Sequence, residues 1–339
     1  MAADLFGEMV YVQEGGVPWH GSGIPVEATI TGDELKDKLN LSQIALRPIF
    51  TYGMDGTILK VSDKMATIRT KDNIVVGVVG TDFNPLQDAD LIDTLDTLRV
   101  EGLCAFETAG LLRGGSRFFV SLKVPNGLLR LKTPNGKEDL VLQYLLVSHG
   151  HDGSLRAQVD PTNIRVVCQN TVTAARQEAE GNGISFAIKH TINAESRMQA
   201  AIAAYKAGMT FHRDFAEYAQ LMVNTPFSAA KMKELAESMF PTPEGKESDI
   251  PAGVLKGRYE LQRFFVEGKG HEELALVGTA WGAYNSITEY LDWQRPTRGD
   301  KDKTEAEVKA KKWEASQFSP QIIERKQFAL AEIERLVTA

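Results

Sequence analysis

The sequence predicts an α+β fold, a mostly antiparallel sheet with packed helices followed by an all-helical C-terminal half. Up to about residue 190, short runs of β-branched and aromatic residues alternate with turns marked by glycine, proline and asparagine, as is typical of strands. Beyond that point, apolar residues recur at helical spacing. We therefore expect three parts: an N-terminal arm with a short helix over residues 1–45, an α+β core domain over 46–190, and a helical region over 191–339.

The elements of the first two parts have local signals. Thr31 and Glu34 stand where a helix N-cap and the first helical turn would lie. Lys71-Asp72-Asn73 separates two β-branched runs, which predicts a hairpin. A leucine-rich stripe at helical spacing starts after Pro85 and stops before Gly102. The expected elements are a helix over 31–41, a hairpin over 64–79, a helix over 86–99, strands over 103–112, 116–125, 139–149 and 164–170, a short helix over 172–180 and a strand over 183–190.

The remainder of the chain predicts a succession of amphipathic helices. Prolines at Pro241, Pro243 and Pro296 mark helix ends, because proline cannot continue a helical hydrogen-bond ladder. A lysine-rich stretch, Lys301 to Lys312, is expected to be a mobile segment. The expected helices cover 193–224, 228–239, 254–266, about 279–295 and 320–336.

The charge is unevenly distributed. A net charge of −7 and a pI of about 5.5 argue against a protein that binds nucleic acid over its whole surface. Between Arg113 and Arg176, however, nine lysines and arginines face four acidic residues. This local excess of positive charge predicts a basic strip within the sheet-forming half.

Composition also limits the compartment and the chemistry. Cys104 and Cys168 are too few for a disulfide framework or a zinc ribbon, which favours a reducing cytoplasm. No run approaches the roughly 20 apolar residues of a membrane helix, and the N-terminus lacks the basic and apolar regions of a secretory signal. The chain carries neither a phosphate-cradling P-loop nor a dinucleotide fingerprint, so no cofactor is expected.

Two histidines and an aspartate occur within four positions in the run Ser148-His149-Gly150-His151-Asp152-Gly153. On a strand, residues two apart share a face, so His149 and His151 could bind one metal ion, with Asp152 as a further ligand. The alternative is a structural turn, because Asp-Gly is a hairpin-turn pair. We favour the turn, since a catalytic zinc site needs a third protein ligand that the sequence does not identify.

Basic residues interleaved with aromatic residues predict a different kind of site. Phosphate oxygens attract arginine and lysine, and single-stranded bases stack on exposed aromatic side chains. We expect Phe119 to supply such a stacking surface. The expected nucleic-acid-binding residues are Arg113, Arg117, Phe119, Lys123, Arg130, Lys132, Arg156 and Arg165.

A set of short motifs resembles the phage/plasmid-related protein family of unknown function, from about Val17 to Leu336. The motifs are VPWHGSG, ETAGLLRGG, SHGHDGS, RVVCQNT, GTAWGAYNSITEYLDW and KWEASQF. The resemblance implies one histidine directly before aspartate, which maps to His151 and Asp152 and leaves His149 as a local addition. It also implies a DNA-handling or phage–host role. The element order is more loosely similar to single-strand DNA annealing proteins, which implies a homo-oligomer with a basic groove.

These observations lead to one main hypothesis and two alternatives. We expect a phage- or plasmid-encoded protein of the host cytoplasm that binds or anneals single-stranded DNA in recombination or replication, without catalysis. The first alternative is a metal-dependent hydrolase acting on nucleic acid or nucleotide, with His149, His151 and Asp152 as ligands. The second alternative is a phage–host interaction protein without catalysis.

Overall fold

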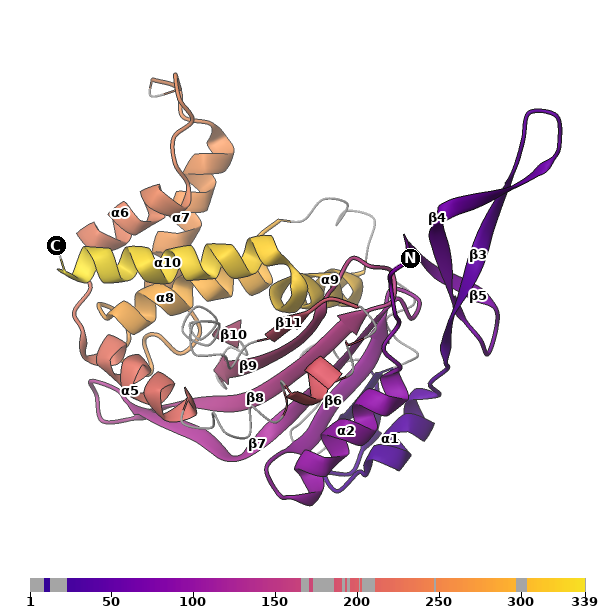
Figure 1. Cartoon of the computed structure of the whole chain (residues 1–339). Helices are drawn as coiled ribbons and strands as arrows, with labels where there is room; N and C mark the ends of the chain where they lie inside the picture. The colour runs from indigo at the N-terminus through magenta and orange to yellow at the C-terminus, as the bar shows by residue number, and fades with distance from the viewer. Residues whose placement is uncertain are drawn as a thin grey trace. The chain divides into compact units, whose positions relative to one another are not determined.

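The computed structural model describes most of the chain, in two compact units (Figure 1). The predicted helix over 172–180 and most of the predicted strand over 164–170 lie outside the described residues. Unit 1 comprises Met1–Asn126, Tyr144–Pro161 and Ala179–Met209, and unit 2 comprises Gly127–Gln143, Thr162–Glu178 and Thr210–Ala339. The described residues are 9–12, 23–165, 171–172, 186–190, 193, 196–200, 202, 211–246, 248–296 and 304–338.

The larger sheet has the strand order β10-β9-β8-β7-β6-β1-β2, with β11 also paired to β9. Pairing is parallel between β1 and β2 and antiparallel between β1 and β6, and between β6 and β7. The strands β7, β8 and β9 contribute residues to both units. The bounds are β1 Met9–Val12, β2 Ile24–Val26, β6 Ala105–Leu112, β7 Arg117–Lys132, β8 Glu138–Gly150, β9 Ala157–Arg165, β10 Thr171–Val172 and β11 Phe186–Ile188.

Two helices of unit 1 precede or follow the smaller sheet. Helix α1 (Gly32–Leu39) begins with the capping box that Thr31 and Glu34 predict, each side chain bonding to the backbone of the other. Helix α2 (Asp88–Val100) buries its leucine stripe and confirms the predicted helix over 86–99. Contacts join α1 to α2, and both helices contact β6.

The smaller sheet is antiparallel, in the order β3-β4-β5, with β3 Ile44–Tyr52, β4 Ile58–Arg69 and β5 Ile74–Gly80. The β4–β5 pair confirms the predicted hairpin. Strand β5 pairs only with residues 64–69 of β4, whereas residues 58–61 of β4 pair with the end of β3 alone. The outer part of the β3–β4 hairpin, residues 49–61, is therefore two-stranded, and we call it the ribbon. Figure 1 shows it extending beyond β5.

Unit 2 builds its core from helices. Helix α8 lies at the centre of this packing, because all of its residues are buried and it contacts α5, α7 and α10. A π-helical turn, η3 (Tyr290–Gln294), follows α8 directly. The other helices are α5 Phe211–Asn224, α6 Ala229–Met239, α7 Ala252–Glu267, α8 Ala280–Glu289, α9 Glu305–Phe318 and α10 Pro320–Thr338.

The structure confirms the α+β prediction and corrects three boundaries. Strand β7 continues past Pro125 to Lys132, with a positive φ at Asn126. Strand β9 begins at Ala157, before the predicted start, and includes Pro161. The described pairings of β9 with β11 and β10 involve residues 157–159 and 163–164, so Pro161 lies between them.

The lysine-rich stretch is the third correction. Its residues from Glu305 onward form the first half of α9, which starts with a capping box between Thr304 and Glu307. Residues 301–303 lie outside the described part of the chain. Among the described helices, none combines the length and the apolar composition that crossing a bilayer requires.

Candidate functional site

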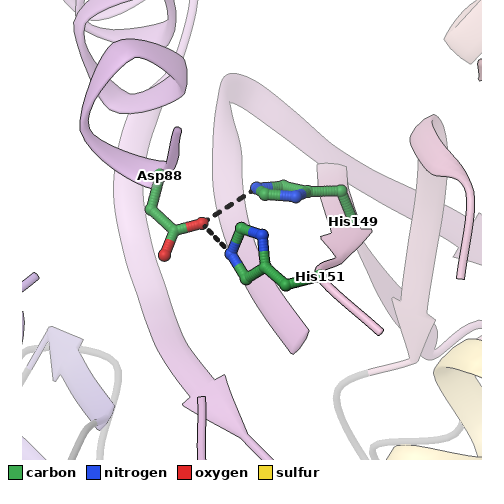
Figure 2. A group of neighbouring side chains, drawn as sticks. All are labelled: Asp88, His149 and His151. Carbon is green, nitrogen blue, oxygen red and sulfur yellow. Dashed lines mark hydrogen bonds and ion pairs between the residues drawn. The ribbon is translucent and has the colours of Figure 1, made fainter. Parts of the chain in front are cut away.

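The end of β8 and the start of α2 bring together three buried side chains. His149 is the penultimate residue of β8, His151 follows that strand, and Asp88 is the first residue of α2. The Nε2 atoms of both histidines lie 3.0 Å from the same oxygen, Oδ1 of Asp88 (Figure 2). Both histidines are 0% exposed and Asp88 is 3% exposed. We call these three residues the Asp-His-His cluster.

The cluster keeps its carboxylate ionised. Burial alone would raise the pKa of Asp88, but the charge and hydrogen bond of His151 and the close approach of His149 outweigh it, so this pKa lies well below its usual range. Burial lowers the pKa of His149, against the opposing effect of Asp88. The Nδ1 atoms of both histidines are buried without a hydrogen-bond partner in the described part of the chain.

A third buried histidine borders the cluster. The ring of His190 stacks on Phe83 at a centroid distance of 4.8 Å and lies 5.7 Å from the ring of His149. Burial, aided by the charges of His149 and His151, lowers the pKa of His190 to about 3. His190 is not among the residues whose possible ligand atoms come together.

Asp152, a metal ligand only in the alternative interpretation, holds the turn that the sequence predicted. Its Oδ1 atom accepts hydrogen bonds from the backbone N and the Oγ of Ser154, at 2.9 and 2.7 Å, which holds the turn after β8. The smaller sheet packs on this turn, because Thr67 Oγ1 donates a 2.8 Å bond to the carbonyl oxygen of His151. The structure thus brings the two histidines to Asp88. Sequence reasoning missed Asp88, since it lies 63 residues from His151.

The basic residues expected to bind DNA are divided between the two units. Arg113, Arg117, Lys123 and Arg156 belong to unit 1. Arg113 and Arg156 are exposed, and Lys123 is half-buried. Arg117 is half-buried and donates a 2.9 Å hydrogen bond to Ser154 Oγ. These four basic residues are therefore at least partly accessible to solvent, and all four lie in unit 1.

The remaining expected residues fit the prediction less well. Arg130 and Lys132 belong to unit 2, where Arg130 pairs with Glu138 at 2.6 Å and Lys132 is exposed. The side chain of Arg165 lies outside the described part of the structure. Phe119 is 0% exposed, so the expectation of a stacking surface there is corrected: both faces of β7 are covered at this point.

Exposed aromatic residues occur instead on the ribbon. Phe50 and Tyr52 are 56% and 78% exposed. The register pairs Phe50 with Lys60 and Tyr52 with Ile58, and cross-strand partners share a face of a sheet. One face of the ribbon therefore presents two aromatic rings, an exposed lysine and an isoleucine. The sequence carries one signal for the ribbon, which is the β-branched and aromatic residues on both sides of Gly53 and Gly56. That pattern indicates strands, but it does not show that the aromatic rings are exposed.

Comparison with protein families gave one match. A family model described as a domain of unknown function (DUF932) matches residues 75–313, which include the Asp-His-His cluster and leave out the ribbon. Comparisons with curated proteins and with solved structures gave no match.

Proposed function

This chain belongs to the DUF932 family, and we propose that it binds single-stranded DNA through one face of the ribbon. The observation that carries the proposal is the pair of exposed rings, Phe50 and Tyr52, beside Lys60. Aromatic side chains stack on unpaired bases of any sequence, and a neighbouring lysine attracts the phosphate backbone. Large exposed apolar groups on a two-stranded ribbon are otherwise costly in water, which supports a bound partner.

The accessible basic residues of unit 1 support the same proposal. Arg113 and Arg156 lie in the turns after β6 and β8, and Lys123 lies on β7. They would add electrostatic attraction that releases counterions from DNA, so binding should weaken steeply with salt. Phe119 has no part in the proposal, because it is buried.

The proposal extends to the biological setting and to self-association. The resemblance to phage- and plasmid-related proteins favours a role in recombination or replication, where annealing proteins act as oligomers. Leu59 of the ribbon is also exposed, and its neighbours Ile49 and Val61 are half-buried, so the opposite face is apolar as well. We propose that this second face contacts another copy of the chain.

Hydrolysis at the Asp-His-His cluster is not part of the proposal. A catalytic metal site keeps a position open to water and substrate. Here all three side chains are buried, with at most 3% exposure, which gives a substrate no access.

Fluorescence anisotropy of a labelled oligo-dT strand, titrated at low and at high salt, tests the proposal. The variants Phe50→Ala and Tyr52→Ala should each weaken binding by roughly 1–3 kcal/mol, the usual value of one stacked base. Tyr259→Ala is the matched control, because Tyr259 is 63% exposed on α7, in the other unit. No detectable binding at low salt, or equal losses in Tyr52→Ala and Tyr259→Ala, would refute it.

Light scattering with and without the DNA strand tests self-association. We expect an oligomer whose mass falls in Leu59→Lys, because a lysine on the apolar face would have to be desolvated in the contact. A wild-type monomer under both conditions would refute self-association while leaving DNA binding to be judged by anisotropy.

A further inference from the structure

We infer that Asp88, His149 and His151 form a binding site for a divalent transition-metal ion of the zinc or iron(II) type. This inference is independent of the DNA-binding proposal, since the Asp-His-His cluster and the ribbon share no residue. Two imidazoles and one carboxylate form a ligand set that such ions prefer, whereas magnesium and calcium prefer oxygen ligands alone.

The distances within the cluster suit coordination. Zinc binds histidine nitrogen and carboxylate oxygen at about 2.1 Å, which places neighbouring ligand atoms roughly 3.0–3.4 Å apart. The two Nε2 atoms each lie 3.0 Å from Asp88 Oδ1. All three ligand atoms lie within 4.8 Å of one another, so a small movement of the histidine rings would bring them around one ion.

A purely hydrogen-bonded cluster would be poorly satisfied at this depth. His149 and His151 both point at one oxygen of Asp88, as Figure 2 shows, but only His151 makes a hydrogen bond to it, and the Nε2 atom of His149 has no hydrogen-bond partner among the described residues. A buried ring nitrogen without a hydrogen-bond partner is costly. A bound cation would replace the single hydrogen bond between His151 and Asp88 with three coordinate bonds, and it would give the Nε2 atom of His149 a partner.

The location of the cluster indicates what the ion would do. The ion would connect the first residue of α2 to the end of β8. Asp88 and His151 are 63 residues apart in the sequence. Because the ligands are buried, the ion would enter as the chain folds, and binding would add directly to the stability of the fold. The site is therefore structural.

The unpartnered Nδ1 atoms also set the strength of binding. Histidine ligands of tight metal sites donate their second ring N–H to an acceptor, and losing such a partner typically costs about 10–100-fold in affinity. His149 and His151 lack that partner in the described part of the chain. Binding should accordingly be weaker than at a fully supported zinc site, although burial of the ligands should slow removal of the ion by a chelator.

Metal content after refolding tests the inference. The full chain is unfolded with EDTA, refolded with zinc, cobalt(II) or magnesium, and freed of excess ion before elemental analysis and thermal melting. We expect one zinc or cobalt ion per chain, no magnesium, and a higher melting temperature with zinc. Asp88→Asn and His151→Gln should lose the ion, and His190→Gln should keep it, because His190 is buried nearby but outside the ligand set.

The visible spectrum of the wild-type protein refolded with cobalt tests the inference without any variant, so it is decisive even if a variant fails to fold. Bound cobalt should give d–d absorption bands that disappear when zinc is added. The inference is overturned if wild-type protein refolded with zinc holds no ion, if the cobalt spectrum is that of the free ion, or if His190→Gln loses the ion as completely as Asp88→Asn.

Discussion

Gly77 of β5 lies against Asp152 in the turn after β8, so closely that a β-carbon on Gly77 would stand 2.4 Å from the Cα atom of Asp152. Glycine is the only residue that permits this approach, because any other would press a carbon atom into the backbone. The contact seats the smaller sheet on the turn that follows the Asp-His-His cluster. It also explains why β5 needs glycine within a β-branched run.

The first prediction is that Gly77→Ala destabilises the protein by at least about 1–3 kcal/mol, as overpacking of a close contact does. Gly80→Ala is the matched control on the same strand, because nothing lies within 4 Å of a β-carbon there. Urea denaturation of the two variants measures the difference in the free energy of unfolding. Equal stabilities would show that the turn moves away without cost.

The second prediction concerns a buried ion pair in unit 2. Lys326 Nζ lies 2.6 Å from Asp292 Oδ1, and both side chains are at most 1% exposed. Ser316 Oγ donates a 2.7 Å hydrogen bond to the same oxygen. Lys326→Met should cost roughly 3–5 kcal/mol, because it removes the ammonium group from a buried ion pair with the carboxylate of Asp292.

The exposed pair Lys309–Glu305 on α9, at 2.7 Å, provides the control for that variant. Lys309→Met should change the free energy of unfolding by no more than about 0.5 kcal/mol, since exposed helical pairs contribute little. Denaturant titrations of both variants at neutral pH measure the two effects. A loss in Lys326→Met as small as that in Lys309→Met would contradict the prediction.

The third prediction is a loss of stability in mild acid that depends on His190. The folded pKa of His190 is about 3, whereas an unfolded histidine titrates near pH 6.5. As the pH falls below about 6.5, His190 binds a proton in the unfolded chain but not in the folded chain. The free energy of unfolding therefore falls by up to about 1.4 kcal/mol per pH unit from this residue. The lowered pKa of His149 acts in the same direction.

Asp88 affects a different pH range. Its stabilising contribution is complete above the unfolded pKa, about 3.9, and is lost only as the pH falls below that value. Unfolding measurements between pH 7 and 5 therefore separate the contribution of the histidines from that of Asp88. His190→Phe, which keeps a ring beside Phe83, should show a shallower loss than wild type over this range. An unchanged slope would mean that His190 is protonated in the folded protein.

Local sequence signals were sufficient for most elements and insufficient for the sites. Thr31 and Glu34 predicted a capping box, and the leucine stripe of α2 predicted a buried helix face, because both depend on residues within one or two turns. Phe119 was expected to be exposed from alternation along β7. Alternation gives the side of a strand but not what covers that side, and here both sides are covered.

By itself, the sequence determined the α+β class, the strands β6 to β8, most of the helices, and the turn at Asp152 and Gly153, since each rests on short-range patterns of hydrophobicity and turn chemistry. Only the tertiary structure decided that Asp88 joins His149 and His151, and that Phe50 and Tyr52 face solvent. Both facts depend on how distant segments pack. Asp88 contacts a histidine 63 residues away because α2 packs near the end of β8, and the local sequence pattern does not predict that packing.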